Sequence, residues 1–589
     1  MRGYFRTKDT LYLFLFVALN VIEWLKATRD GDVWKVAVNC IGPVMMVMIM
    51  SAYPIKDFLN WWNGIWTFIC LAAMIGVYIY WKVNTVPYIL LMYVTGVINI
   101  WWIVMVAVHL AARLWRRKVP CRKWNVLGIM WVMMSCIMIL SVSGRVWPVW
   151  FLGMYGLFYL TEYSAADRRS LIHGMVNGTL LSFLIIQTYA YCFRPYDEVR
   201  YKGAFVNCNM MALYYLIQYC MILIKLHWLK LDGGRWWQKT FWLFGAGVLL
   251  VFQFMTLSRT AFLAATAVTV VYAIWVMRGK WRLGLLGIFG RAVLLGLSAV
   301  LAFPAVFASI RWLPTVLKHP VWYTGEYHED RVHSFDAPDS GKYVSLEEFL
   351  ESALGRFMRK KDAQEAEASA LEAALQEGAG GKQEPEASAV DATWQEGAGG
   401  KQEAEASAVD AAWQEGAGAE REAEVSKDVP VLGPQKEWTS AEIRFAIWDC
   451  YRKDLTWRGH SEDQGYYLIT EDYRCWHAQN LWLQVAYYYG IPAGILLTAL
   501  TPVMIFFYLS GYGKGKFDKR YGIIPIMMII AFFTFGTLEV VWNPGQLILC
   551  LFFLVQHPLF WKKDKDDKRN DREAKQRIRS DQNQRAYEI

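Results

Sequence analysis

Apolar segments of roughly 20 residues recur along most of this 589-residue chain. Each is long enough to cross the hydrocarbon core of a bilayer as a helix. The sequence therefore predicts an all-α polytopic integral membrane protein with about 14 transmembrane helices, which excludes a soluble enzyme. The segments run from about residues 10 to 27, 33 to 52, 62 to 81, 87 to 112, 124 to 142, 146 to 161, 171 to 193, 205 to 228, 240 to 257, 260 to 277, 283 to 310, 480 to 510, 521 to 540 and 544 to 560.

One long polar segment, from Arg311 to Trp476, interrupts the apolar pattern. It holds 33 acidic and 18 basic residues, whereas the rest of the chain holds 19 acidic and 43 basic residues. The excess of bases lies in short loops between apolar segments, as is typical of cytoplasmic loops. This distribution accounts for the basic residues without a nucleic-acid partner.

Alternate threading of the segments through a bilayer places most basic loops on the side of both termini. By the positive-inside rule, that side is cytoplasmic and the long polar segment lies outside. The N-terminus lacks a small-residue cleavage site, which favours a retained membrane helix. The basic stretches on the cytoplasmic side are Arg113 to Lys123, Arg168 and Arg169, Lys225 to Lys239, Arg278 to Arg282, Lys514 to Arg520, and the tail after Trp561.

The pattern divides the chain into five regions. They are N-terminal transmembrane helices (1–193), a transmembrane core with outer-face arginine motifs (194–310), one large extracytoplasmic loop (311–476), C-terminal transmembrane helices (477–561) and a charged cytoplasmic tail (562–589). Within the loop, residues 363–426 form 19-residue repeats rich in Ala, Glu, Gly and Gln. Such a composition cannot build a core, so these repeats are predicted to be a disordered or loosely helical spacer.

Two further groups in the polar segment have open interpretations. Cys450 and Cys475 can form a disulfide if the segment faces an oxidising space, but sequence does not give their separation. The stretch His328 to His333 contains zinc-ligand residue types. Because a third clear ligand is missing, a simple polar loop is favoured and no metal site is predicted.

The first motif that indicates chemistry is Arg200-Tyr201-Lys202-Gly203-Ala204-Phe205-Val206-Asn207-Cys208-Asn209, at the start of an apolar helix. Exposed N–H groups and the positive end of a helix favour an anion there, and Arg200 can donate two parallel hydrogen bonds to a phosphate. The alternative is a pair of interfacial cations, Arg200 and Lys202, beside a helix cap.

The second motif is Leu257-Ser258-Arg259-Thr260, a tight turn between two apolar segments. A guanidinium at this place is costly unless it is paired or faces a wet cavity. No acid lies nearby in the sequence, so a functional role for Arg259 is favoured over a structural ion pair.

The third motif joins the polar segment to the membrane. It comprises Arg444 within Ala441 to Trp448, and then Arg474-Cys475-Trp476-His477-Ala478-Gln479-Asn480 before an apolar helix. An imidazole at such a position can act as a base near neutral pH. The alternative is that His477 is an ordinary polar residue, although Arg474 and Asn480 on either side favour a role in a site.

These motifs, in this order, resemble the O-antigen ligase and O-antigen polymerase family of bacterial envelope glycan transferases. RYKGAFVNCN is similar to the family's Arg-x-x-Gly-x-Phe-x-Asn-x-Asn motif, LSRTAF to its Ser-Arg turn, RFAIW to its Arg-x-x-x-Trp segment and HAQNLWLQ with GIPAG to its His-Asn-x-x-Leu-Gln motif and following glycine. The similarity covers roughly Arg194 to Leu509, with the repeats as an insertion. In one departure, the family's histidine falls on Gln479, and His477 stands two residues earlier.

The resemblance implies transfer of a glycan from an undecaprenyl-diphosphate carrier to an acceptor sugar at the outer face of the bacterial cytoplasmic membrane. It implies neither a nucleotide sugar nor a required metal, so no cofactor is expected. Arg200 and Arg259, assisted by Lys202 and Arg444, would hold the donor diphosphate. His477 would accept the proton of the acceptor hydroxyl, with the nearby polar residues Arg474, Gln479 and Asn480 contributing to substrate binding. The partners are therefore a lipid-linked donor, a saccharide acceptor and membrane lipid.

Two other classes of protein remain as alternatives. A multi-span transporter, including a flippase of lipid-linked oligosaccharides, fits the number of spans. Transporters, however, place charges near the bilayer midplane and often have two similar halves, and neither feature is evident in the sequence. A membrane anchor that displays the repeats does not require arginines at outer turns.

Overall fold

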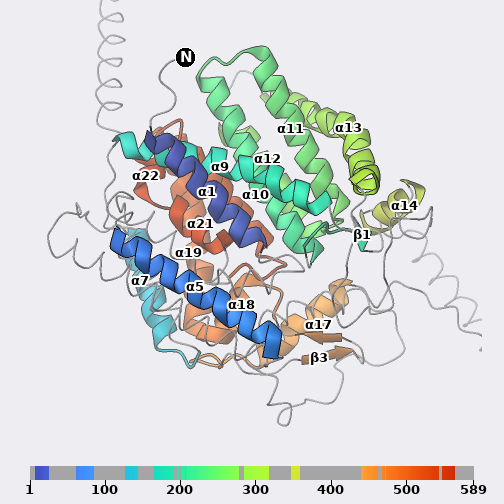
Figure 1. Cartoon of the computed structure of the whole chain (residues 1–589). Helices are drawn as coiled ribbons and strands as arrows, with labels where there is room; N and C mark the ends of the chain where they lie inside the picture. The colour runs from blue at the N-terminus through green and yellow to red at the C-terminus, as the bar shows by residue number, and fades with distance from the viewer. Residues whose placement is uncertain are drawn as a thin grey trace, which may run out of the picture.

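The structure is a computed structural model of the chain, and most of its described residues are helical (Figure 1). It describes residues 7–25, 61–84, 126–143, 165–191, 196–197, 200–205, 207–276, 284–317, 346–357, 440–461, 467–470, 473–475, 477–542 and 547–563. The predicted segments 33–52, 87–112 and 146–161, the repeats 363–426 and the stretch 328–333 lie outside the described residues.

The described part of the chain contains long helices, several shorter ones and two small antiparallel sheets. Their order is α1 (Thr7–Leu25), α5 (Trp61–Asn84), α7 (Val126–Ile139), α9 (Ala165–Tyr191), β1 (Tyr196–Asp197), β2 (Arg200–Tyr201), α10 (Cys208–Leu231), α11 (Trp236–Met255), α12 (Arg259–Val271), the π-helical turn η1 (Tyr272–Val276), α13 (Gly284–Leu317), α14 (Leu346–Phe357), α17 (Ser440–Lys453), β3 (Tyr467–Thr470), β4 (Tyr473–Cys475), α18 (Leu481–Tyr489), α19 (Ile491–Gly513), α20 (Ile523–Phe535), α21 (Leu547–Val555) and α22 (Pro558–Trp561).

Four described helical segments are long and apolar enough to cross a membrane: Arg168–Tyr191, Cys208–Leu231, Phe289–Ile310 and Ile491–Gly513. This supports a helical membrane protein, while the total of about fourteen spans stays a prediction. The expectation of an all-α protein is wrong in one respect, because β1 pairs with β2 and β3 pairs with β4. Both hairpins lie in connections between helices, where the backbone must find hydrogen-bond partners outside a helix.

The centre of the bundle is formed by α10 and α20, which bury nearly all their side chains. Both helices are apolar around most of their circumference, the pattern expected of a helix enclosed on all sides. By contrast, α11 and α13 expose large apolar side chains such as Phe241, Phe289 and Leu297. Exposed apolar side chains on a helix of this kind are suited to contact with lipid.

A parallel pair of helices, α1 and α9, lies against this centre (Figure 1). Gly174 and Gly178 make the close approach possible: a Cβ atom on Gly174 would lie 2.6 Å from the Cβ of Tyr12, and one on Gly178 would lie 2.7 Å from that of Phe16. Two small residues four apart are a common packing device between membrane helices. The amide of Asn20 adds a hydrogen bond of 3.2 Å to the hydroxyl of Thr179.

The predicted span from 480 to 510 is confirmed only for its second part, the spanning helix Ile491–Gly513, because the chain turns back at Gly490. Helix α18 ends there, and α19 begins at Ile491 and packs beside α18 in the opposite direction. Gly490 has a φ of 94°, and a Cβ atom on it would lie 2.3 Å from the carbonyl oxygen of Trp457. Only glycine fits such a position without strain. Pro492, in the first turn of α19, lacks the N–H that a continuing helix would need.

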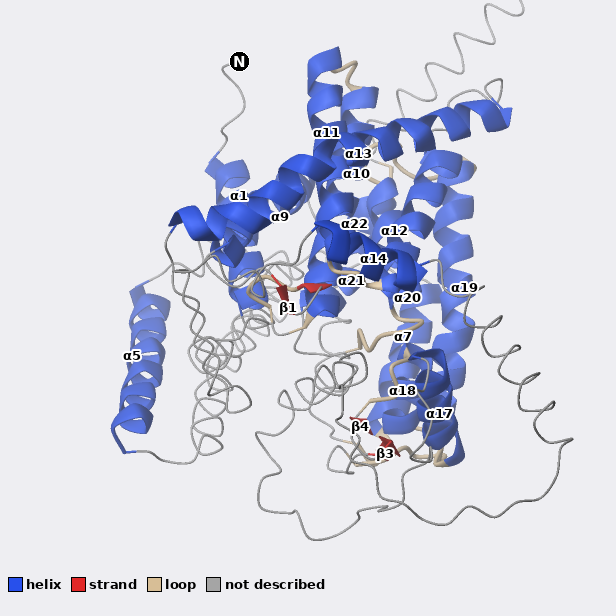
Figure 2. Ribbon diagram, turned by 90° about the vertical axis from the view of Figure 1, so that its right-hand side faces the viewer, coloured by secondary structure: helices blue, strands red, loops and turns tan. Residues whose placement is uncertain are grey.

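A small unit formed by α17, the β3–β4 hairpin and α18 lies at one end of the molecule, away from α11 (Figure 2). Its separate apolar cluster includes Ile447, Tyr451, Tyr467 and Ala478. The disulfide considered between Cys450 and Cys475 is absent, since both are free thiols. The thiol of Cys475 instead donates a hydrogen bond to the carbonyl oxygen of His477, at 2.9 Å.

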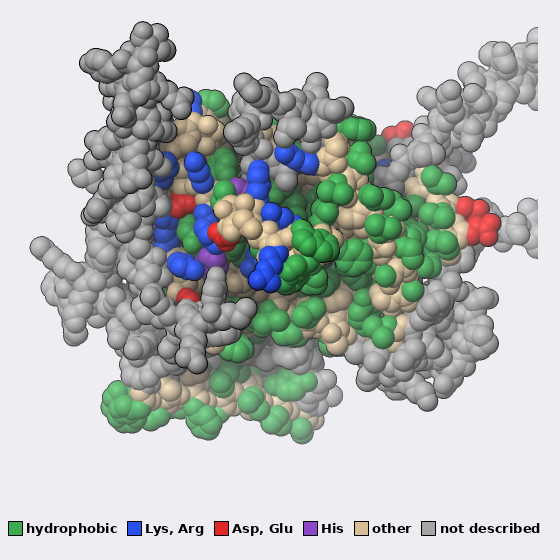
Figure 3. All heavy atoms as spheres, turned by 90° about the horizontal axis from the view of Figure 1, so that it is seen from above, with side chains coloured by type: hydrophobic (Ala, Val, Ile, Leu, Met, Phe, Trp, Pro, Cys, Tyr) green, Lys and Arg blue, Asp and Glu red, His purple; other side chains and the backbone are tan. Residues whose placement is uncertain are grey.

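The opposite end of the bundle gathers basic residues from separate loops, and Figure 3 shows Lys and Arg side chains concentrated on this face. The buried guanidinium of Arg168 pairs with Asp518 at 2.9 Å, and Arg520 pairs with Asp232 at 2.7 Å. Phe517 bridges to Lys562, at the start of the C-terminal tail. Loops that the threading assigns to one side therefore meet at one end, which we call the basic end. The compartment that it faces stays a prediction.

The packing of α1 on α9 generates a test of the fold. Gly174→Ala and Gly178→Ala should each destabilise the protein by about 1–3 kcal/mol, because the added methyl group meets backbone and Cβ atoms of α1. The measurement is the midpoint of thermal unfolding in detergent. Gly76→Ala in α5 is the control, since nothing lies within 4 Å of its new Cβ atom. Equal midpoints for all three variants would contradict the close α1–α9 contact.

Candidate functional site

The first motif forms the approach to α10. Asn207 caps the helix by accepting a hydrogen bond from the backbone N–H of Asn209, at 2.7 Å. Gly203, with a φ of 52°, turns the chain between β2 and this cap. Lys202 is only 5 % exposed. The predicted cations therefore sit in an ordered turn at the positive end of a buried helix.

Arg200 connects the first motif with the second. Its Nε donates to the carbonyl oxygen of Thr256 at 3.1 Å, and its Nη2 donates to Oδ1 of Asn209 at 3.1 Å. A guanidinium has five N–H donors, so these two bonds orient the group and leave other donors for a ligand. The half-buried side chain is thus fixed in direction before any anion binds.

The second motif begins α12 immediately after Thr256. Ser258 is its N-cap and accepts a hydrogen bond from the backbone N–H of Ala261, while Arg259 is the first helical residue and is half-buried. Leu257 has a φ of 49°, an unfavourable value for a residue with a branched side chain. Gln253 stabilises the turn by donating to the carbonyl oxygen of Ala261 at 2.8 Å. The turn thus places Arg259 at the same end of the bundle as Arg200.

The third motif forms the start of α18. Asn480 caps this helix by accepting from the backbone N–H of Leu483 at 3.0 Å, and its Nδ2 donates to the carbonyl oxygen of Thr537 at 3.0 Å. Gln479 has a φ of 45°, so the chain turns sharply just before the cap. Leu481 N–H also donates to the carbonyl oxygen of Gly536, at 2.8 Å. The segment after α20 therefore holds the third motif in place.

Glu539 joins this segment to the first motif. The amide of Asn209, which accepts from Arg200, donates through Nδ2 to Oε1 of Glu539 at 2.7 Å. None of the three sequence motifs contains Glu539, which stands out in the sequence only as a single acid at the end of an otherwise apolar segment. Two sets of hydrogen bonds thus meet at the segment after α20: Thr256, Arg200, Asn209 and Glu539 form one, and Asn480 and Thr537, two residues before Glu539, form the other. We call these six residues the outer network.

The other predicted residues lie just before α18 or in the small unit of α17, α18 and the β3–β4 hairpin. His477 is half-buried, three residues before Asn480. Arg444 is half-buried on α17, which packs against α18 and β3. Arg474 lies in β4, and its side chain lies outside the described part of the structure. Arg444 and Arg474 thus belong to the unit of α17, α18 and the β3–β4 hairpin.

Two tyrosines of this unit have perturbed acidity. Burial raises the pKa of Tyr451 and of Tyr467, and the hydrogen bond that the Tyr467 hydroxyl donates to Asp454 raises the pKa of Tyr467 further. Both phenols are therefore protonated at neutral pH. Tyr467 acts as a structural hydrogen-bond donor to Asp454.

Comparison with known protein families, curated proteins and solved structures found no match for this chain. The described residues also contain no group of three or more His, Cys, Asp or Glu side chains arranged to hold a metal ion.

The outer network can be tested without an assay of function. Asn209→Asp should destabilise the protein by about 1–3 kcal/mol, because it removes the donor to Glu539 and places two carboxylates in contact. Adding Glu539→Gln should restore stability, because the amide introduced at position 539 can donate to the carboxylate introduced at position 209, which still accepts from Arg200. Thermal unfolding in detergent measures both effects. Failure of the second substitution to rescue the first would show that the two side chains are not partners.

Proposed function

We propose that this chain is a membrane glycan transferase that moves an oligosaccharide or polysaccharide from a lipid diphosphate to an acceptor sugar. The proposal rests first on the outer network, which gathers three separate sequence motifs at the end of the bundle opposite the basic end. It rests second on the resemblance of those motifs, in order, to the O-antigen ligase and polymerase family.

The convergence of helix ends supports binding of an anion at this place. Helices α10, α12 and α18 all begin here, capped by Asn207, Ser258 and Asn480. Each N-terminus carries a partial positive charge, and Arg200 and Arg259 add full charges beside two of them. The positive electrostatic field of these charges is suited to stabilise a diphosphate.

The proposed reaction uses this field to stabilise the leaving group. The acceptor hydroxyl attacks the anomeric carbon of the donor glycan, the carbon–oxygen bond to the diphosphate breaks, and the lipid diphosphate leaves with the bonding electrons. Arg200 and Arg259 would hold the phosphate oxygens as negative charge develops on them. A base takes the hydroxyl proton.

Two residues are candidates for that base, one in the outer network and one three residues before Asn480. His477 is the histidine that the resemblance favours, although it stands two residues before the family position. Glu539 is a carboxylate already oriented by Asn209. Gln479 cannot accept a proton at neutral pH and can only position a substrate. We propose His477 as the base, with Glu539 as its competitor in the experiment below.

The decisive assay uses purified protein in detergent and an undecaprenyl-diphosphate oligosaccharide with an acceptor glycan, without nucleotide or ion gradient. Formation of the enlarged glycan supports transfer. If no glycan is transferred, but the protein in liposomes moves the lipid-linked oligosaccharide between leaflets, the chain is a flippase and the proposal fails.

The arginines provide a first mutational test. Arg200→Lys and Arg259→Lys should each lower turnover by roughly a hundredfold, because lysine cannot supply two directed bonds to developing phosphate charge. Arg452→Lys on α17 is the control, since Arg452 is exposed and pairs only with Asp449 among the described contacts. Protein level and thermal unfolding must match the parent. Full activity in both arginine variants would remove them from the mechanism.

The base is identified by a second comparison. His477→Ala should abolish transfer between roughly pH 6 and 9, the range over which a histidine base titrates, whereas Glu539→Gln should retain the parent's pH profile. The measurement is the initial rate as a function of pH, with Gln479→Ala as a positioning variant beside them. The opposite result, with His477→Ala active and Glu539→Gln inactive, would assign the proton transfer to the carboxylate.

A further inference from the structure

The basic end contains a lysine that the proposed function does not use. Lys225 lies on α10, six residues before the helix ends at Leu231, in a segment able to cross a membrane. Its Nζ lies 5.6 Å from the ring centroids of both Trp228 and Trp242. Among the described residues it forms no ion pair within 4.0 Å. An amine at this depth is costly unless a counter-charge reaches it.

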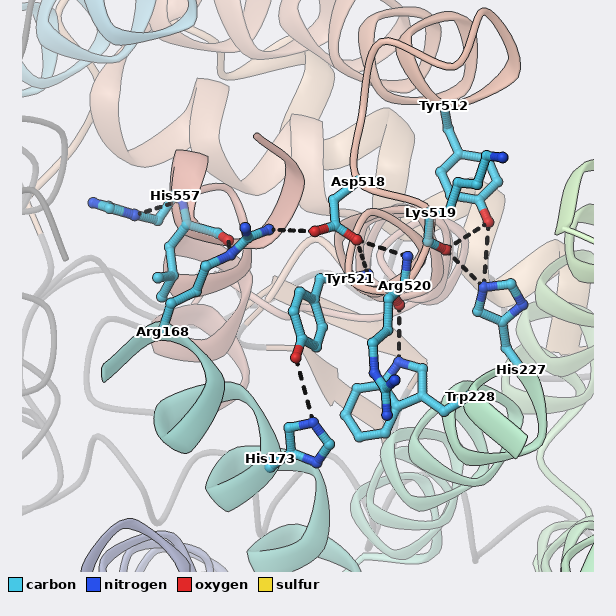
Figure 4. Close-up of polar contacts among 11 residues, drawn as sticks. Arg168, His173, His227, Trp228, Tyr512, Asp518, Lys519, Arg520, Tyr521 and His557 are labelled. Carbon is cyan, nitrogen blue, oxygen red and sulfur yellow. Dashed lines mark hydrogen bonds and ion pairs between the residues drawn. The ribbon is translucent and has the colours of Figure 1, made fainter. Parts of the chain in front are cut away.

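The nearby carboxylates are already engaged with other groups. Asp518 pairs with Arg168, and its second oxygen accepts the backbone N–H groups of Arg520 and Tyr521. Figure 4 shows how Arg168, His227 and Trp228 hold this turn by hydrogen bonds. Asp232 is bound by both terminal nitrogens of Arg520, at 2.7 and 2.9 Å. These two acids therefore leave the amine of Lys225 without an ion-pair partner in the described part of the chain.

Two further cations, Arg520 and Arg169, add to the positive charge at the basic end. The guanidinium carbon of Arg520 lies 5.6 Å from the centroid of Trp228, on the ring that Lys225 also contacts. The charges of Arg520, Lys225 and the exposed Arg169 all act on the ring of His173, which lies 4.5 Å from Trp228. Lys225 on α10 and Arg520 in the loop after α19 thus share the ring of Trp228, and Arg169 on α9 adds a third positive charge that acts on the neighbouring His173.

The neighbouring surface shows what kind of anion fits. Helix α11, which packs against α10 and carries Trp242, exposes Trp237, Phe241 and Phe244. Indoles and lysines together are typical of the membrane interface, and basic pockets between helix ends bind anionic lipid head groups. A soluble phosphate would use the cations but not the apolar surface next to them.

We propose that Lys225, with Arg520 and Arg169, binds the phosphate of an anionic phospholipid whose acyl chains lie along the exposed face of α11. The bound phosphate supplies a counter-charge in contact with the amine, whereas Asp232 acts on Lys225 only from beyond ion-pair distance. This site is at the opposite end from the outer network and does not depend on glycan transfer.

The test is retention of phosphatidylglycerol by the detergent-purified protein, counted by native mass spectrometry against phosphatidylcholine. Lys225→Gln should weaken retention of phosphatidylglycerol about fivefold, the effect of about one interfacial cation. Lys230→Gln is the matched control: it removes the same charge from the same helix, but Lys230 is exposed and lies nearer to Arg291. It should change retention less than twofold.

A second substitution is expected to strengthen the retention of phosphatidylglycerol, and it tests the proposal even if the Lys225→Gln protein does not accumulate. Asp232→Asn frees Arg520 from its exposed partner and should strengthen phosphatidylglycerol retention severalfold. Equal retention in Lys225→Gln and Lys230→Gln, or no gain in Asp232→Asn, would overturn the site. Displacement of the lipid by millimolar inorganic phosphate would overturn its assignment to a lipid. All of these readouts are independent of transferase activity.

Discussion

The absence of water inside a bilayer is the constraint on which this structure depends. A helix enclosed by other helices has to satisfy its polar groups within the protein, so polar side chains are costly along most of its length. In the centre of this bundle, α20 is apolar almost throughout, and α10 pairs its mid-helix hydroxyls inside the protein, Tyr215 with Gln187 at 2.8 Å and Tyr219 with Thr269 at 2.6 Å. The ion pairs of the neighbouring loops lie beyond the ends of both helices. The chain therefore concentrates its chemistry at two ends, which differ in their charge and in their hydrogen-bond donors.

The end of the bundle that holds the outer network is electrostatically positive because of the direction of its helices. Three helix N-termini meet there, so the backbone N–H groups of three first turns and their caps face one small region. Asn209 is suited to its central position because an amide accepts and donates at once: it accepts from Arg200 and donates to Glu539. A carboxylate or an ammonium at position 209 offers only one of these roles. The network thereby orients the guanidinium of Arg200 and the carboxylate of Glu539 through one shared amide.

Much of the helical framework could be predicted from sequence, because length and apolar composition suffice to locate a buried helix. The segment expected from 205 to 228 is α10 at Cys208–Leu231, and that from 240 to 257 is α11 at Trp236–Met255. The turn at Gly490 was missed because the residues on both sides are apolar, and hydropathy alone does not register a positive φ. Glu539 was missed for a different reason. Its partner Asn209 is 330 residues away in the chain, and only the packing of α10 beside α20 brings the two together.

The spacing along α10 and α20 connects the two ends of the molecule. At one end Asn209 bonds to Glu539, and at the other the indole of Trp228 donates to the carbonyl oxygen of Arg520 at 2.8 Å. Nineteen residues separate Asn209 from Trp228, and nineteen separate Arg520 from Glu539. Along α10, at the rise of an α-helix, this is about 28 Å, close to the thickness of a bilayer's hydrocarbon core. Helix α20 covers only Ile523–Phe535 of its interval, and turns at both of its ends complete the path to the two bonds. The outer network and the basic end are thus kept a membrane's thickness apart, which is the arrangement required if each end meets the polar groups of a different leaflet.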